Sequence, residues 1–131
     1  MQDERNVSLI EKARQVATRA YAPYSNFRVG AAVADANGSI YTGCNVENAS
    51  YGLTVCAERN AIFTAICGGA ARPFAAIAVT CIDAEQGGCS PCGACRQVIA
   101  EHLRPDGQVI VEGLGTFEVA ELLPHSFRLP V

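Results

Sequence analysis

Residues 74–82 read FAAIAVTCI, an apolar run that contains no charged residue, no proline and no glycine. A short uninterrupted run of this kind is typical of a strand that is covered on both faces. Helical patterns precede it and follow it along the chain. We therefore predict an α/β fold in which helices cover both faces of a sheet.

Helices are predicted on both sides of this strand. Residues 54–69, TVCAERNAIFTAICGG, read as a buried helix that ends in a glycine pair. The next helix is predicted to open with Ser90 as its N-cap and Pro91 as its first residue, and to continue through residues 92–103. Near the N-terminus, apolar residues recur at helical spacing over residues 7–21, which predicts an amphipathic helix.

Further strands complete the predicted sheet. Residues 28–46 contain two strand-like runs around an Asn-Gly pair, which favours a hairpin turn that matches the twist of its strands. Residues 108–113 read as another strand, and residues 117–124 as a last short strand or helical turn. The sequence thus predicts one domain over residues 1–131, a three-layer α/β/α sandwich with a mixed five-stranded sheet.

The charge pattern restricts the partners. The net charge is −3 and the chain has one lysine, Lys12, so no basic patch is available for nucleic acid. The N-terminus is too charged for a signal peptide, and no apolar run approaches the ~18 residues of a membrane span. We expect a cytoplasmic protein whose seven cysteines stay reduced, so that clustered cysteines indicate a metal site or catalysis.

Four cysteines are candidates for metal binding. Cys92 and Cys95 are three residues apart at the start of a predicted helix, and Cys56 is near the start of another. Free N–H groups and the helix dipole favour thiolates at such positions. Zinc in catalytic sites takes three protein ligands and one water molecule, whereas structural sites take four protein ligands. A closed four-thiolate site that includes Cys89 is therefore an alternative to an open site.

Glu58 favours the open site. It follows Cys56 by two residues in a helix that is otherwise apolar, and a buried carboxylate without a role is costly. An exposed glutamate that interacts with the helix dipole is the alternative. Beside a metal with an open position, a glutamate can take a proton from water and return it to a leaving group.

TVCAERNA (residues 54–61) followed by PCGACRQ (residues 91–97) resembles the cytidine deaminase family, in its small three-cysteine type. The similarity runs from AYAPYSNFRVGAAV (residues 20–33) to ELLPHSF (residues 121–127). The resemblance implies a cytidine deaminase-like fold and zinc-dependent hydrolytic deamination of cytidine and deoxycytidine in pyrimidine salvage, without an organic cofactor. The implied zinc ligands are Cys56, Cys92 and Cys95. Glu58 is the implied proton shuttle.

The resemblance also assigns the substrate-binding residues. It implies that Asn45 and Glu47 bind the 3′-hydroxyl of a free nucleoside, that Phe27 stacks on the pyrimidine and that Ala57 offers backbone groups to the base. An ordinary polar loop and a core phenylalanine are the alternatives for these positions. Phe127 is similar to a residue that reaches into a neighbouring subunit's site, which implies a homotetramer. We expect no nucleic acid and no membrane as partners.

The remaining polar residues and cysteines near the motifs need an explanation too. Three thiolates on a divalent cation leave a net charge of −1, so we expect Arg59 to hydrogen-bond the thiolates. Arg96 is the alternative for this role. Cys89 is expected outside the ligand set, and three other cysteines are expected to be small buried residues: Cys44, Cys67 and Cys81.

Competing functions make different use of these residues. A relative that acts on a modified aminopyrimidine nucleoside would keep the same metal site. A deaminase that edits RNA or DNA needs a basic groove, which the sequence lacks. A structural zinc protein would use the cysteines and leave Glu58, Asn45 and Glu47 without a role.

Overall fold

The computed structural model describes residues 2–84 and 89–130. The elements in chain order are α1 (Gln2–Ala17), β1 (Val29–Ala34), β2 (Ile40–Cys44), the 3-10 helix η1 (Tyr51–Leu53), α2 (Ala57–Cys67), β3 (Phe74–Cys81), α3 (Gly93–His102), β4 (Leu103–Val111), β5 (Gly115–Glu118) and α4 (Val119–Leu122). None of the helices in these two ranges has the length and apolarity needed to cross a membrane.

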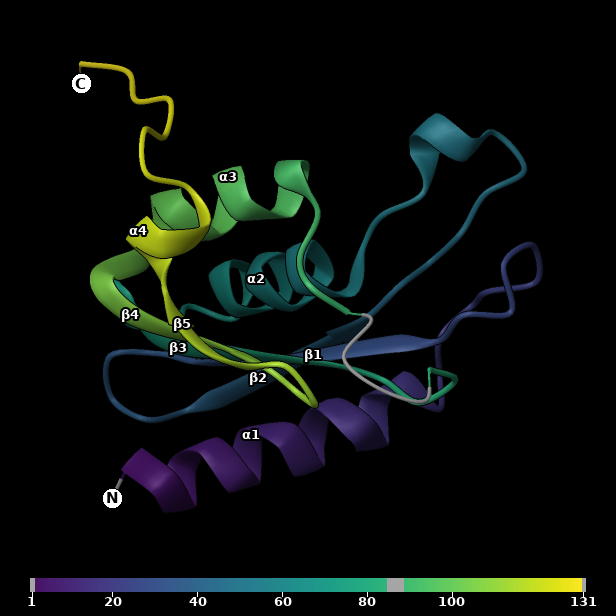
Figure 1. Cartoon of the computed structure of the whole chain (residues 1–131), viewed down its shortest axis with the longest axis horizontal. Helices are drawn as coiled ribbons and strands as arrows, with labels where there is room; N and C mark the ends of the chain where they lie inside the picture. Colours follow the sequence, from purple (N-terminus) through teal and green to yellow (C-terminus); the bar gives the residue numbers. More distant parts are fainter. Residues whose placement is uncertain (1, 85–88, 131) are drawn as a thin grey trace.

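The strands form one five-stranded sheet in the order β2-β1-β3-β4-β5. β3 and β4 are parallel, and the other neighbouring pairs are antiparallel. Helix α1 covers one face of the sheet, and α2, α3 and α4 cover the other (Figure 1). The predicted three-layer sandwich with a mixed sheet is therefore confirmed.

The apolar strand β3 lies at the centre of the sheet and is buried along its whole length. One apolar cluster fills the space between the sheet and α1, with Leu9 and Ala13 against small residues such as Ala78. A larger cluster lies between the sheet and the other helices and includes Ile62 and Ile99. The lack of polar alternation in residues 74–82 thus reflects burial on both faces.

Glycines allow two helices to pack directly on the strands. A Cβ added at Gly30 in β1 would lie 1.9 Å from the Ala13 carbonyl oxygen of α1. A Cβ added at Gly43 in β2 would lie 2.3 Å from the Ala61 nitrogen of α2. The second contact fixes α2 against β2. The first residues of α2 and the segment that follows β2 both line the pocket described below.

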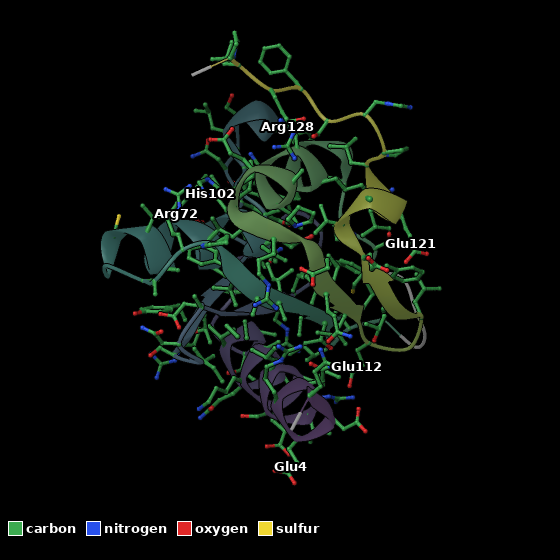
Figure 2. All side chains as sticks on the ribbon, turned by 90° about the vertical axis from the view of Figure 1, so that its left-hand side faces the viewer. Glu4, Arg72, His102, Glu112, Glu121 and Arg128 are labelled. Carbon is green, nitrogen blue, oxygen red and sulfur yellow. The ribbon has the colours of Figure 1, made fainter. Side chains whose placement is uncertain are left out.

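Charged side chains connect α1 to the C-terminal end of β4. Glu112, just after β4, accepts a hydrogen bond of 2.7 Å from Arg14 Nε and another from the Thr80 hydroxyl. Figure 2 shows Glu112 near α1, and Arg128 of the C-terminal tail on the opposite side of the sheet from Glu4. The tail therefore belongs to the α2–α3 side of the molecule.

Most predicted elements form, but several boundaries differ. The hairpin is confirmed, with Gly38 at a φ of 90° and with Asp35 accepting hydrogen bonds from two turn amides. The first helix covers Gln2–Ala17 instead of residues 7–21, because its acidic first turn interacts favourably with the helix dipole. β4 begins five residues earlier than predicted, and both alternatives for residues 117–124 occur, as β5 and α4.

The start of α3 corrects another prediction. The N-cap is Cys92 and the first helical residue is Gly93, so Ser90 and Pro91 precede the helix. Both are held by Arg96, which donates to the Pro91 carbonyl at 2.8 Å and to the Ser90 hydroxyl at 2.9 Å. The Ser-Pro pair is therefore a stabilised loop, and a cysteine takes the capping position.

Candidate active site

Three cysteines meet where two helices begin. Cys56 is the N-cap of α2, Cys92 is the N-cap of α3, and Cys95 is in the first turn of α3. The three Sγ atoms all lie within 4.8 Å of one another. The N-termini of both helices, with their free N–H groups and positive dipole ends, thus lie beside the same group of thiols, an arrangement that suits bound negative charge.

The donor set of this group fits zinc. Thiolates are preferred zinc ligands, and Zn–S bonds of about 2.3 Å place tetrahedral sulfurs roughly 3.8 Å apart. The Sγ atoms of Cys56 and Cys92 are 4.0 Å apart. Within the described parts of the chain, Cys89 is not a member of this group. The arrangement matches an open three-ligand site rather than a closed four-thiolate site.

The protein environment lowers the pKa of Cys56 to about 5. The largest cause is a hydrogen bond from the Cys95 thiol, and the Arg59 guanidinium adds a further hydrogen bond and a positive charge. The pKa of Cys95 is raised, since its proton is held by the neighbouring sulfur. Cys56 therefore ionises more readily than Cys95.

The two arginines considered above have different contacts. Arg59 Nη2 donates to Cys56 Sγ at 3.4 Å, and its Nε is buried without a hydrogen-bond partner among the residues described here. Ionisation of the thiols would give this guanidinium further acceptors. Arg96 instead donates to the loop before α3 and to the Leu122 carbonyl at 3.1 Å. Arg59 is thus the arginine in contact with the thiols.

Glu58 lies in the first turn of α2 and is 5 % exposed, so the alternative of a solvent-exposed carboxylate is wrong. Burial raises its pKa to about 7, and the negative charge of Cys56 contributes in the same direction. A carboxylate with this pKa can both accept and release a proton near neutral pH, which is the property that general acid–base catalysis requires.

A pocket of ≈ 460 Å³ connects the thiols to the polar residues of the β1–β2 side. Most predicted site residues line it: Phe27, Asn45, Glu47, Cys56, Ala57, Glu58 and Cys92. Cys95 is fully buried behind them. Sequence reasoning missed other lining residues, namely Ser25, Val29, Thr54, Cys89 and Ser90. Ser25, Val29 and Thr54 lie inside the motifs quoted above, but nothing there marks them as pocket residues. Cys89 and Ser90 were considered only as an alternative metal ligand and as a helix cap.

Asn45 and Glu47 form part of the pocket wall through contacts with the chain before β1. The buried Asn45 amide accepts from the Val29 N–H and donates to the Phe27 carbonyl, both at 2.9 Å. Glu47 Oε1 accepts from the backbone N–H groups of Tyr24 and Ser25, at 3.0 and 3.1 Å. These donors and the Ser25 hydroxyl hold the pKa of Glu47 below its usual range.

Phe127 lies outside this pocket. The residue is 69 % exposed, while its backbone N–H and carbonyl bind the side-chain amide of Gln97 at 3.1 and 2.9 Å. The tail is thus attached to α3 and presents an aromatic ring to the surface. Of the three cysteines expected to be buried, Cys81 is buried, Cys44 is half-buried and Cys67 is exposed at the end of α2.

Comparisons with known proteins agree with this geometry. The family model described as the cytidine and deoxycytidylate deaminase zinc-binding region matches residues 3–112. The chain is 49 % identical over 123 residues to the cytidine deaminase of Sporosarcina psychrophila, covering 91 % of this chain and 88 % of that protein. The crystal structure of the cytidine deaminase from Burkholderia pseudomallei is similar, with 47 % identity, a TM-score of 0.83 and coverage of 92 % and 98 %. The Mycobacterium tuberculosis enzyme has 40 % identity, a TM-score of 0.83 and coverage of 94 % and 97 %.

Proposed function

The chain belongs to the cytidine and deoxycytidylate deaminase family, and from this premise we propose that it hydrolyses cytidine and deoxycytidine to uridine and deoxyuridine, with release of ammonia. The observation that carries the proposal is one pocket that contains a buried carboxylate, Glu58, beside a group of three thiols. A zinc scaffold would have no use for this carboxylate.

In this proposal Cys56, Cys92 and Cys95 hold the zinc ion. When bound, zinc lowers the pKa of a water molecule and so supplies a nucleophile at neutral pH. A metal ion bound by three thiolates accepts electrons less strongly than one bound by neutral ligands. Arg59 offsets part of the negative charge of the thiolates through its contact with Cys56.

Glu58 moves the protons of the reaction. It accepts a proton from the attacking water and delivers it to N3 of the pyrimidine. It then takes the second proton from the hydroxyl group that has added to C4 and delivers it to the departing amine, which leaves as ammonia while C4 becomes a carbonyl. Phe27, in the pocket wall, stacks on the ring. Ala57, the first residue of α2, has a backbone N–H without an intrahelical acceptor, and this group donates to the carbonyl oxygen of the base.

The sugar end of the pocket favours a free nucleoside. Asn45 and Glu47 line the pocket together with Phe27 and bind the 3′-hydroxyl in this proposal. A carboxylate at that position repels a 3′-phosphodiester, and the net charge of −3 adds to the repulsion. Nucleic acid is therefore not the substrate.

The protein is further proposed to be a single domain over residues 1–131, to work in the cytoplasm, where its seven thiols stay reduced, and to form a homotetramer. The tail supports the last point, because Gln97 fixes the backbone of Phe127 while its ring lies exposed. An exposed aromatic ring on a fixed backbone suits insertion into a neighbouring subunit.

The variant Phe127→Trp tests the assembly, since the chain has no other tryptophan. We expect light scattering to give four times the mass of the chain, and the tryptophan emission to be blue-shifted and protected from a soluble quencher. Leu114→Trp, in the exposed turn between β4 and β5, is the control that should remain quenchable. A tetramer of Phe127→Trp whose emission is quenched as readily as that of the control contradicts the proposed insertion.

The activity itself is tested with the purified protein. We expect about one zinc ion per chain and conversion of cytidine to uridine, followed by ultraviolet absorbance. No turnover at full zinc content would favour a modified aminopyrimidine nucleoside as the substrate. A closed site with four thiolate ligands would favour the structural zinc protein instead.

A further inference from the structure

Ser25 occupies a central position among the residues of the sugar end. Its hydroxyl donates a hydrogen bond to Glu47 Oε2 and accepts one from the Phe27 N–H at 3.1 Å. Ser25 lines the pocket that contains the thiols and also the adjoining pocket between Tyr24 and Tyr51. No role has been assigned to it so far.

The contacts of Ser25 belong to a continuous chain of hydrogen bonds. From Glu47 the chain passes through the Ser25 hydroxyl to the Phe27 backbone, whose carbonyl accepts from the Asn45 amide. Asn45 in turn accepts from the Val29 N–H at the start of β1. The three side chains proposed to bind base and sugar are therefore tied to one another, and Ser25 is the link between the carboxylate and the other two.

The backbone around Ser25 is shaped to make these contacts. Asn26 has a φ of 56°, in the left-handed region that asparagine adopts more readily than most other residues with a side chain, and its N–H donates to the Ala22 carbonyl at 3.0 Å. This turn places the Phe27 N–H on the hydroxyl of a residue only two positions earlier.

The Glu47 carboxylate is left with little freedom. Its two oxygens offer about four lone-pair positions, and the Tyr24 N–H, the Ser25 N–H and the Ser25 hydroxyl already occupy three of them. Two backbone donors share Oε1, so the hydroxyl of Ser25 is the contact that fixes Oε2. Without this hydrogen bond the carboxylate could rotate about its Cγ–Cδ bond. Its remaining lone-pair position would then no longer point in a fixed direction.

We propose that Ser25 is a positioning residue that orients Glu47 toward the 3′-hydroxyl of the nucleoside and so contributes to the selection of substrates with an intact sugar. The inference rests on the proposed function, in which Glu47 accepts a hydrogen bond from that hydroxyl. Ser25 acts through Glu47 and does not itself touch the reacting atoms. Its effect should therefore appear in substrate binding and depend on the presence of the 3′-hydroxyl.

The test combines variants of Ser25 with two substrates, cytidine and 3′-deoxycytidine. We expect Ser25→Ala to raise KM for cytidine about tenfold, as for a lost hydrogen bond to a charged group, with less than a threefold change in kcat. Ser25→Thr retains the hydroxyl and should restore most of the affinity. With 3′-deoxycytidine, Ser25→Ala should change KM by less than about twofold. Ser8→Ala in α1, on the other side of the sheet, is the matched control.

Each other outcome overturns a specific step. An equal loss for both substrates would mean that Ser25 acts through Phe27 or the loop as a whole, and no loss for cytidine would remove its role. If Ser25→Ala is less stable by thermal unfolding, the ratio of its effects on the two substrates still decides, because a loss of folded protein lowers the rate with both substrates equally and does not depend on the 3′-hydroxyl. If the wild-type enzyme does not distinguish the two substrates, the proposed role of Glu47 itself is wrong. That outcome is distinguishable from a failure of the role proposed for Ser25.

Discussion

Replacing Glu58 by glutamine is expected to lower kcat for cytidine by about 10⁴-fold and to leave the zinc content unchanged. Glutamine keeps the size of the side chain but cannot accept a proton from water or deliver one to the base. Because Glu58 serves more than one proton transfer in the proposed reaction, the loss should lie at the upper end of the range for general acid–base catalysis. The residue is buried in the pocket beside Cys56, so no other carboxylate of the pocket can replace it at the same position.

The measurement is single-turnover and steady-state conversion of cytidine, with metal analysis of the same preparation. Glu11→Gln in α1, an exposed residue on the far face, carries the same chemical change and should retain full activity. A zinc-loaded Glu58→Gln enzyme with more than a tenth of the wild-type kcat would show that another group carries the protons. Loss of zinc in the variant would instead place Glu58 in the support of the metal site.

Thermal unfolding gives a second, independent readout of Glu58. The pKa of this residue in the folded protein, about 7, is above that of an unfolded chain, about 4.3. The folded state therefore binds the proton more tightly, and its stability decreases as pH rises through this interval. The neutral glutamine removes this dependence, so Glu58→Gln should unfold at the same temperature as the wild type, or higher, at pH 8 when both proteins are measured without bound metal.

Much of the fold could be predicted from the sequence because burial leaves a direct record in composition. The central strand β3 is apolar at nearly every position since both of its faces are covered. The start of α3 was misplaced for a different reason. Ser90 and Pro91 are good residues for a helix start, yet the contacts of Arg96 hold them in a loop and leave Cys92 as the cap. Such tertiary contacts override local preference.

The site shows the same division. It could be predicted that Cys56, Cys92 and Glu58 lie in one pocket, because their residue types and spacing are those of a metal site with a neighbouring carboxylate. Ser25 could not be singled out, because a serine in a turn is common and its hydroxyl gains importance only through Glu47, which is 22 residues away in the chain. The exposure of Cys67 was unpredictable for a related reason, since a helix pattern does not say which side of its last turn remains uncovered.

The second large effect is expected at Arg59. Replacing it by glutamine should weaken zinc retention against a chelator by about 10–100-fold, as is usual for residues that support metal ligands. The guanidinium contacts Cys56 Sγ at 3.4 Å and contributes to the low pKa of that thiol. Glutamine can at most supply a neutral hydrogen bond, so protons should compete better for the sulfur and the acid limit of activity should move to higher pH.

Zinc release measured as a function of pH, beside the pH profile of kcat/KM, decides whether Arg59 has this role. Arg19→Gln, at an exposed position just after α1, removes the same charge far from the thiols and should change neither quantity. If Arg59→Gln leaves zinc retention and the acid limb unchanged, the charge of the three thiolates must be offset by other means, of which the N-termini of α2 and α3 are the nearest. If both quantities change together, the guanidinium acts on the ligands. A change in thermal stability alone would mean that Arg59 contributes only to packing. Packing by itself would not move the acid limb of the kcat/KM profile toward higher pH.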